Sequence, residues 1–275
     1  MSFRCRLASA GALAACVALP ACSVALDFDA TSAKRAGTSE SFCGKHLSPP
    51  ALFCDDFDSA ALSTKWPVVE QSNGSAKDDD GAAQSAPNSL LSVVQPLAPG
   101  EGARAIGAVT FPSLASAKVG LRISFALRVD DFDESNGASN VVFNFLYGPL
   151  DDYNEISLNL VSTESAVSLQ IAENAQKVGE EPGEYAQHGP FTKKVARGEW
   201  MRVDIDLDID EPVGPSNALR VSFDGKTELD TSLMLALKGG TPRLELGVGW
   251  VDSTNATQRW VVRYDDFVVE AVARR

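Results

Sequence analysis

The most chemically suggestive pattern in the sequence is a run of aspartates at alternate positions of one segment. These carboxylates are Asp204, Asp206, Asp208 and Asp210. Residues two apart on a strand share a face and lie about 6.5–7 Å apart, whereas a retaining glycosidase holds its two carboxyl groups about 5–5.5 Å apart. Asp206 is therefore a candidate catalytic carboxylate. The competing interpretation, which we favour, is a solvated polar face on an amphipathic strand.

Other catalytic arrangements have less support. His46 and His188 are the only histidines, so a zinc site with three histidine ligands is impossible. A serine–histidine–acid triad would depend on one of these two, and neither lies in a G-x-S-x-G context typical of a nucleophile elbow. His188 lies in a glycine- and proline-rich stretch, Pro182–Pro190, which predicts a loop.

Short alternating runs of apolar and polar residues, broken by Gly, Pro, Asn and Asp, predict the strands that must position these side chains. The clearest runs are residues 121–129, 141–147, 155–160 and 203–209. In the second run, the alternation places Val141 on the same face as Phe143. Asp224-Gly225, between two further runs, is a strong hairpin signal. About a dozen such strands suit a large two-sheet jelly roll.

Three stretches match one known pattern in their order and spacing. They are Leu52–Phe57 followed by Trp66, Gly198–Val203 followed by Leu219–Lys226, and Leu244–Trp250 followed by Tyr264–Val269. Together they resemble the concanavalin A-like, or laminin-G-like, jelly-roll domain. The resemblance implies an all-β fold in which two antiparallel sheets pack as a sandwich over residues 43–275. It also implies that Trp200 packs in the core.

The resemblance bears on the acidic residues as well. Laminarinase-type hydrolases of this superfamily carry E-x-D-x-(x)-E on a strand facing the sugar groove, whereas this chain has D-x-D-x-D-x-D and departs at both catalytic positions.

In the family the first and last strands lie side by side, which would bring Asp55 and Asp56 near Asp265 and Asp266. Such oxygen ligands suit a structural Ca²⁺. The alternative is that these aspartates accept hydrogen bonds from turn amides.

Relatives of the alginate-lyase type use His, Tyr, Arg and Gln on the concave sheet, and their strand motifs are not visible here. The polar and aromatic side chains that could line such a sheet are Asn144, Tyr153, Glu155, Asn159, Gln170, Tyr185 and Trp250. The sequence therefore favours a carbohydrate-binding jelly roll without catalytic activity. The alternatives are a polysaccharide lyase or glycoside hydrolase that uses Glu155 or Asp206, and a structural or adhesion module without a small ligand.

Residues 19–22 read Leu-Pro-Ala-Cys and follow a basic start and a short uncharged run. This ending resembles the lipobox of bacterial lipoproteins. The resemblance implies a signal peptide over residues 1–21, a lipid anchor at Cys22 that binds the bilayer, and a flexible tether over residues 22–42. Cleavage after Ala25 is the alternative. The protein would then belong to the bacterial cell envelope, at the outer membrane by analogy.

Cys43 and Cys54 are the cysteines that remain in the folded part, and an even pair in an oxidising compartment predicts a disulfide. The formal net charge is −13, and the leader removes two arginines and no acid. A surface this acidic repels phosphate backbones, so nucleic acid is a poor partner. We expect a monomer whose polymeric partner is a polysaccharide or surface glycan.

Overall fold

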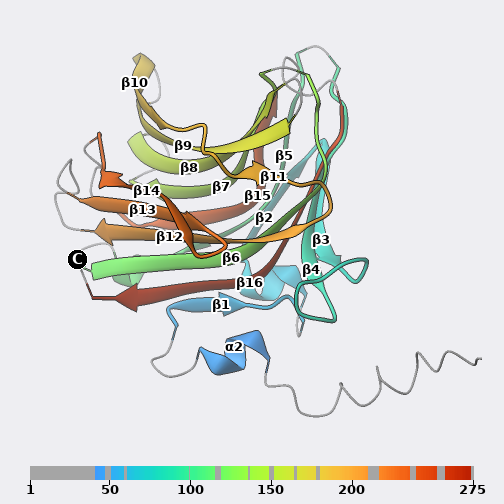
Figure 1. Cartoon of the computed structure of the whole chain (residues 1–275), viewed down its shortest axis with the longest axis horizontal. Coiled ribbons are helices and arrows are strands. Elements are labelled where there is room, and N and C mark those ends of the chain that lie inside the picture. The colour runs from blue at the N-terminus through green and yellow to red at the C-terminus, as the bar shows by residue number, and fades with distance from the viewer. Residues whose placement is uncertain are drawn as a thin grey trace, which may run out of the picture. The chain divides into compact units, whose positions relative to one another are not determined.

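The fold is a sandwich of two antiparallel sheets, each of eight strands, as predicted (Figure 1). The computed structural model describes residues 41–46, 51–58, 61–98, 100–114, 119–135, 137–148, 152–163, 166–177, 180–209, 217–235, 240–252 and 258–273. All of these belong to one compact unit, Glu40–Arg275. The predicted leader, the lipid site Cys22 and most of the tether lie outside the described residues.

The first sheet, called the β6 sheet, has the strand order β14-β13-β12-β6-β16-β4-β3, and β1 pairs with β16. Its strands are β1 (Phe53–Asp55), β3 (Gly74–Asp79), β4 (Ser89–Val94), β6 (Val119–Asp131), β12 (Trp200–Ile209), β13 (Ala218–Phe223), β14 (Lys226–Ser232) and β16 (Trp260–Val272). The first and last strands are therefore neighbours, as the resemblance implied, with Asp55 opposite Phe267.

The second sheet, called the β7 sheet, has the order β10-β9-β8-β7-β15-β5-β2, and β11 pairs with β9. Its strands are β2 (Val68–Ser72), β5 (Gly102–Thr110), β7 (Ser139–Tyr147), β8 (Asp152–Thr163), β9 (Ala166–Lys177), β10 (Glu180–His188), β11 (Lys194–Val195) and β15 (Arg243–Asp252). The described helices are short: α2 (Phe42–Lys45), α3 (Leu62–Lys65) and the 3-10 turn η1 (Pro112–Leu114). None of the described helices is long and apolar enough to cross a membrane.

The core lies between the sheets and is built from the inward side of each alternating strand. In β6, the predicted apolar face from Leu121 to Val129 is buried, with exposures of 0–1% for its members. The Asp224-Gly225 hairpin joins β13 to β14, and both residues have the positive φ values, 50° and 77°, that a tight hairpin turn requires. These two predictions are confirmed.

Two local predictions were wrong. The register of β7 against β8 shifts between Val141 and Phe143, so a bulge inserts one residue and turns Val141 away from the core. Pro182–Pro190 is not a loop, because most of it forms β10, whose pairing with β9 is interrupted only between Glu180 and Glu184. Backbone hydrogen bonds to β9 thus override a composition that favours loops.

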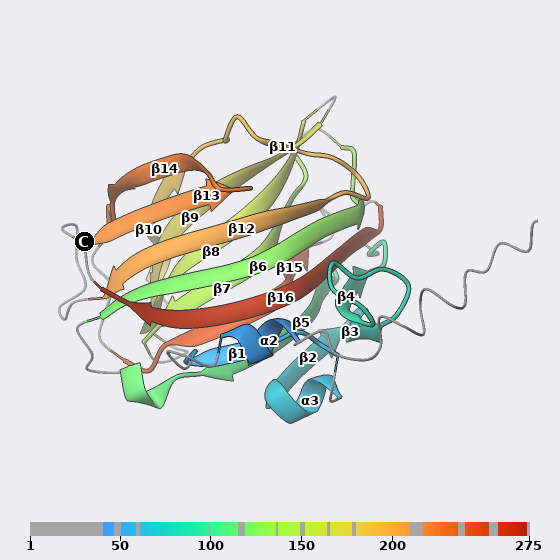
Figure 2. The same cartoon turned by 60° about the horizontal axis from the view of Figure 1, so that its bottom comes forward.

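The predicted disulfide between Cys43 and Cys54 is present, with a sequence separation of 11. It ties α2 to β1, which is itself paired with β16 (Figure 2). The backbone N–H of Cys43 also donates to Asp56 Oδ2 at 3.4 Å. The disulfide therefore fastens the start of the folded unit to its last strand.

Removing this cross-link is expected to lower the free energy of unfolding by roughly 2–3 kcal/mol, because the unfolded chain regains the entropy of an open loop. The variant is the double substitution Cys43→Ser with Cys54→Ser, and urea denaturation measures the change. The wild-type protein in a reducing agent should match the variant. Equal stability of oxidised and cross-link-free proteins would contradict the stabilising role.

Candidate functional site

The outer face of the β7 sheet carries a depression of about 470 Å³. Five strands of this sheet supply its walls: β5, β7, β8, β9 and β15. Its lining combines polar and apolar surface and comes from Arg104, Asn144, Tyr153, Glu155, Asn174 and Glu245, with Val141, Leu146 and Gly249. The volume falls within the range of small-molecule sites, about 300–1,000 Å³. The depression contains three of the predicted groove residues, Asn144, Tyr153 and Glu155.

Strand alternation explains why these side chains share a face. On β8, Ile156, Leu158 and Leu160 are buried in the core, so the residues between them point outward. Register then aligns outward residues across the strands, with Glu155 opposite both Asn174 and Leu146, and Tyr185 opposite Asn174. One row of side chains thus runs across β10, β9, β8 and β7.

Three further predicted groove residues, Asn159, Gln170 and Tyr185, lie on the same outer face, beyond the lining of the depression. Asn159 is opposite Gln170, and Asn159 Nδ2 donates to Ser157 Oγ at 3.1 Å. Gln170 accepts a hydrogen bond from Gln187. Tyr185, on the edge strand β10, is 59% exposed. The side chain of Trp250 lies outside what the structure describes.

A network of two arginines and two glutamates adjoins the depression, and two of its members, Arg104 and Glu245, line the depression itself. Arg104 contacts Glu70 at 2.9 Å and Glu245 at 2.6 Å. Arg243 contacts the same two carboxylates, at 2.7 and 3.0 Å. Asn144 Nδ2 donates to Glu245 Oε2 at 3.2 Å. Within the described part of the chain, Arg104 Nε and Asn144 Oδ1 are buried without a hydrogen-bond partner, which is costly unless water or a ligand meets them.

Two titratable groups in the depression have shifted pKa values. Burial, followed by the nearby charge of Glu245, raises the pKa of Glu155 above its usual 4.5, although the hydrogen bond with Asn174 acts in the opposite direction. Burial, with the charges of Glu155 and Glu245, also raises the pKa of Tyr153 above 10. Glu155 is therefore a stronger base than an ordinary glutamate, and Tyr153 keeps its proton at neutral pH.

Asp206, the other catalytic candidate, lies on β12 in the β6 sheet and is not part of this depression. Arg122 Nε donates to Asp206 Oδ1 at 2.8 Å from the neighbouring strand. Asp204 accepts a hydrogen bond from Ser124 on the same strand pair. These cross-strand contacts are what a polar outer face predicts, and the structure does not bring Asp206 and Glu155 together.

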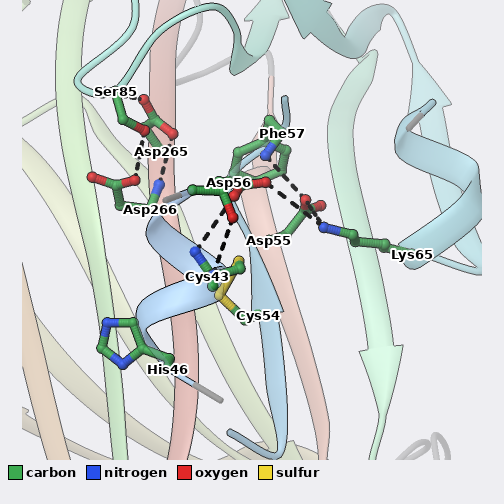
Figure 3. The surroundings of a disulfide bond; sticks show 12 residues. Cys43, His46, Cys54, Asp55, Asp56, Phe57, Lys65, Ser85, Asp265 and Asp266 are labelled. Atoms are coloured by element: carbon green, nitrogen blue, oxygen red, sulfur yellow. Dashed lines mark hydrogen bonds and ion pairs between the residues drawn. A yellow bond between two sulfur atoms is a disulfide. The ribbon is translucent and has the colours of Figure 1, made fainter. Parts of the chain in front are cut away.

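The four aspartates predicted to bind Ca²⁺ are all held by protein donors, as Figure 3 shows for several contacts. Asp55 accepts from Lys65 Nζ, Trp66 Nε1 and the Phe57 amide. Asp265 accepts from the amides of Gln84, Ser85 and Asp266, and Asp266 accepts from the Ser85 hydroxyl. Among the described residues, no group of three or more His, Cys, Asp or Glu side chains is arranged to hold a metal ion. Calcium binding stays a prediction.

Neither histidine lines the depression. His188 Nε2 lies 2.7 Å from Glu173, which is fully buried and also accepts from the amides of Met234 and Leu235. His46 contacts Glu270 at 2.9 Å on the β6 sheet. Both histidines therefore join separate segments of the fold.

Sequence reasoning missed the charged network. Three of its members stand at outward positions within alternating apolar runs: Arg104, Arg243 and Glu245. This alternation was the signal that could have indicated their place on the outer face. Their meeting with Glu70 depends on the pairing of β5 with β2 and β15. The sequence alone does not reveal this pairing.

No protein-family model matches the chain, and no curated protein matches it. Solved structures do match. A crystal structure of an endo-β-1,4-glucuronan lyase from the fungus Trichoderma reesei has a TM-score of 0.61 at 13% identity, covering 81% of this chain and 96% of that one. The chain shares the jelly-roll fold of polysaccharide lyases. An alginate lyase from Aplysia kurodai has a TM-score of 0.57 at 7% identity, covering 81% and 99%.

A third match is a substituted alginate lyase in complex with an alginate trisaccharide. Its TM-score is 0.56 at 14% identity, and the match covers 81% of this chain and 99% of that one. Identities this low concern the fold alone, so the chemistry of this chain has to be argued from its own residues.

Proposed function

We propose that this protein is a polysaccharide lyase that binds a uronate-containing polymer on the outer face of the β7 sheet and cleaves it by β-elimination. The observation that carries the proposal is the convergence of Glu155, Tyr153, Arg104 and Asn144 in one depression. These residues provide the groups that the reaction needs: a base, an acid, and donors for the substrate carboxylate. The fold shared with alginate and glucuronan lyases supports the same reaction class.

Each side chain has a role that follows from its surroundings. Arg104 and Asn144 bind the uronate carboxylate. This carboxylate competes with Glu70 and Glu245 for the Arg104 guanidinium. It also accepts a hydrogen bond from Arg104 Nε, which has no partner within the protein. This neutralisation makes the neighbouring C5 proton more acidic. Glu155 accepts that proton, the C5–H electron pair forms a C4=C5 double bond, and the C4–O bond breaks. Tyr153 donates its phenolic proton to the leaving oxygen.

Incubation of the purified protein with alginate, glucuronan, polygalacturonate and a neutral β-glucan tests the proposal. Polymer length is followed by size-exclusion chromatography and the new double bond by ultraviolet absorbance. We expect shortening of at least one uronate polymer with a matching rise in absorbance. Shortening without absorbance would indicate hydrolysis and overturn elimination, as would intact polymers throughout.

Glycan binding without cleavage is the second candidate, and a specific observation favours it. Arg104 in the depression and the adjoining Arg243 are already paired with carboxylates, and no histidine is among the described lining residues. Polar side chains in rows would still fix sugar hydroxyls. Binding of a polymer in the same incubations, with its length unchanged, would support this candidate over the lyase.

A further inference from the structure

A second, smaller pocket of about 200 Å³ lies on the outer face of the other sheet. Its aromatic and polar lining comes from Trp200 and Arg202 on β12, Gln84, Asp224 of the β13–β14 turn, and Asp266 on β16. Because the outer faces of the two sheets point in opposite directions, this pocket is separate from the depression on the β7 sheet, and the two share no lining residue. The proposed lyase chemistry uses none of these residues.

Trp200 is on this surface because of its position in β12. Met201 and Val203 are buried in the core, so strand alternation directs Trp200 and Arg202 outward. The expectation that Trp200 packs in the core was therefore wrong. Trp66 and Trp260 are fully buried, whereas Trp200 is partly exposed at the pocket. An indole at a polar surface can stack on a flat apolar ligand face while its N–H remains available.

The polar groups around Trp200 are fixed before any ligand arrives. The Arg202 guanidinium lies 5.3 Å from the centre of the Phe42 ring, and its Nη1 donates to the Asp266 carbonyl at 3.0 Å. The disulfide holds the helix that carries Phe42. Asp224 Oδ1 accepts from the Arg202 amide at 2.9 Å. The lining is thus preorganised by contacts with α2, β16 and the hairpin turn.

Asp266 is held in an uncommon backbone conformation. Its φ is +51°, within the left-handed region that non-glycine residues rarely adopt, and β16 has a register shift between Asp265 and Val268. Ser85 donates its hydroxyl to Asp266 Oδ1 at 2.7 Å, as Figure 3 shows. Strain of this kind persists where the surrounding structure enforces it, and it is frequent at binding sites.

We infer that this pocket is a second carbohydrate site that binds one neutral sugar ring of a glycan, with the ring stacked on Trp200 and its hydroxyls bonded to Arg202, Asp266 and Gln84. The combination of an indole, a guanidinium and two carboxylates favours a neutral sugar over an ion. Asp224 and Asp266 disfavour an anion, and the Arg202 guanidinium disfavours a metal cation. A neutral ring with one apolar face and several hydroxyls satisfies both the indole and the charged groups.

Two-dimensional NMR of the ¹⁵N-labelled protein tests this site directly. The Trp200 indole N–H signal is assigned by its loss in Trp200→Phe, and methyl glycosides of glucose, galactose, mannose and N-acetylglucosamine are titrated one at a time. We expect one or more of them to shift the Trp200 indole and the Arg202 and Asp266 amides. Trp200→Ala should weaken that binding roughly tenfold or more, as for an aromatic anchor.

The matched control is Glu155→Gln, which changes the depression on the other sheet and should leave the sugar titration unchanged. This control separates failure of the second site from failure of the lyase proposal. A stationary Trp200 signal with all four glycosides would overturn the inference. A response to calcium or inorganic phosphate alone would also overturn it and identify an ion site. The amide spectrum of Trp200→Ala reports whether that variant is folded.

Discussion

Asp55→Ala is expected to lower the free energy of unfolding by roughly 3–5 kcal/mol, the cost of removing one partner from a buried charged network. The carboxylate is 4% exposed and accepts from Lys65 Nζ at 2.8 Å, Trp66 Nε1 at 2.7 Å and the Phe57 amide at 3.0 Å. Truncation leaves all three donors without this acceptor. Urea denaturation at neutral pH measures the loss.

The loss of stability in Asp55→Ala should exceed that of a single lost hydrogen bond, because Asp55 holds the indole of Trp66. Trp66 is fully buried and packs against Phe53, Phe57 and Phe267. The hydrogen bond from its indole N–H to Asp55 therefore fixes the orientation of a ring at the centre of an aromatic cluster that joins β1 to β16. The matched control is Asp230→Ala, which removes an exposed carboxylate paired with Arg220 on the same sheet. We expect that change to cost about 0–1 kcal/mol. Similar losses in the two variants would refute the buried-network explanation.

Local patterns were sufficient to predict most of the sandwich. Alternation in β6 and β12 identified both strands and the inward faces of both, and Asp224-Gly225 fixed the hairpin between β13 and β14. These features depend on residues close together in the chain. The pairing of β1 with β16 was also predicted, from the resemblance of the two end strands to a known family.

Features that depend on distant pairing were harder to predict. The bulge that turns Val141 outward is visible only in the register of β7 against β8. The strand β10 forms by pairing with β9, which the composition of its own segment does not indicate. Asn144 and Glu155 were found because each is polar within a strand run, and Tyr153 was found as an aromatic side chain that could line the sheet. The ion pairs of Arg104 with Glu70 and Glu245 could not be predicted in this way, because these partners lie 34 and 141 positions away in the sequence.

Glu155→Gln is expected to reduce kcat/KM for a uronate polymer by roughly 10²–10⁴-fold, because the substitution keeps the shape of the side chain and removes the base. Burial and the charge of Glu245 raise the Glu155 pKa above 4.5, so in the wild type the rate should rise with pH through a midpoint above that value. The rate should fall again only where Tyr153, whose pKa is raised above 10, loses its proton. The pH dependence of kcat/KM measures both limbs.

The matched control for Glu155→Gln is Asp206→Asn, at the other catalytic candidate. Asp206 lies on the β6 sheet and pairs with Arg122, so its substitution should leave kcat/KM and both limbs unchanged. Because the amide introduced by Glu155→Gln would retain the polar contacts of the depression, that variant should still bind the polymer. Loss of cleavage with retained binding distinguishes proton transfer from a structural role. Unchanged cleavage in Glu155→Gln would remove this residue from the chemistry and require a different base.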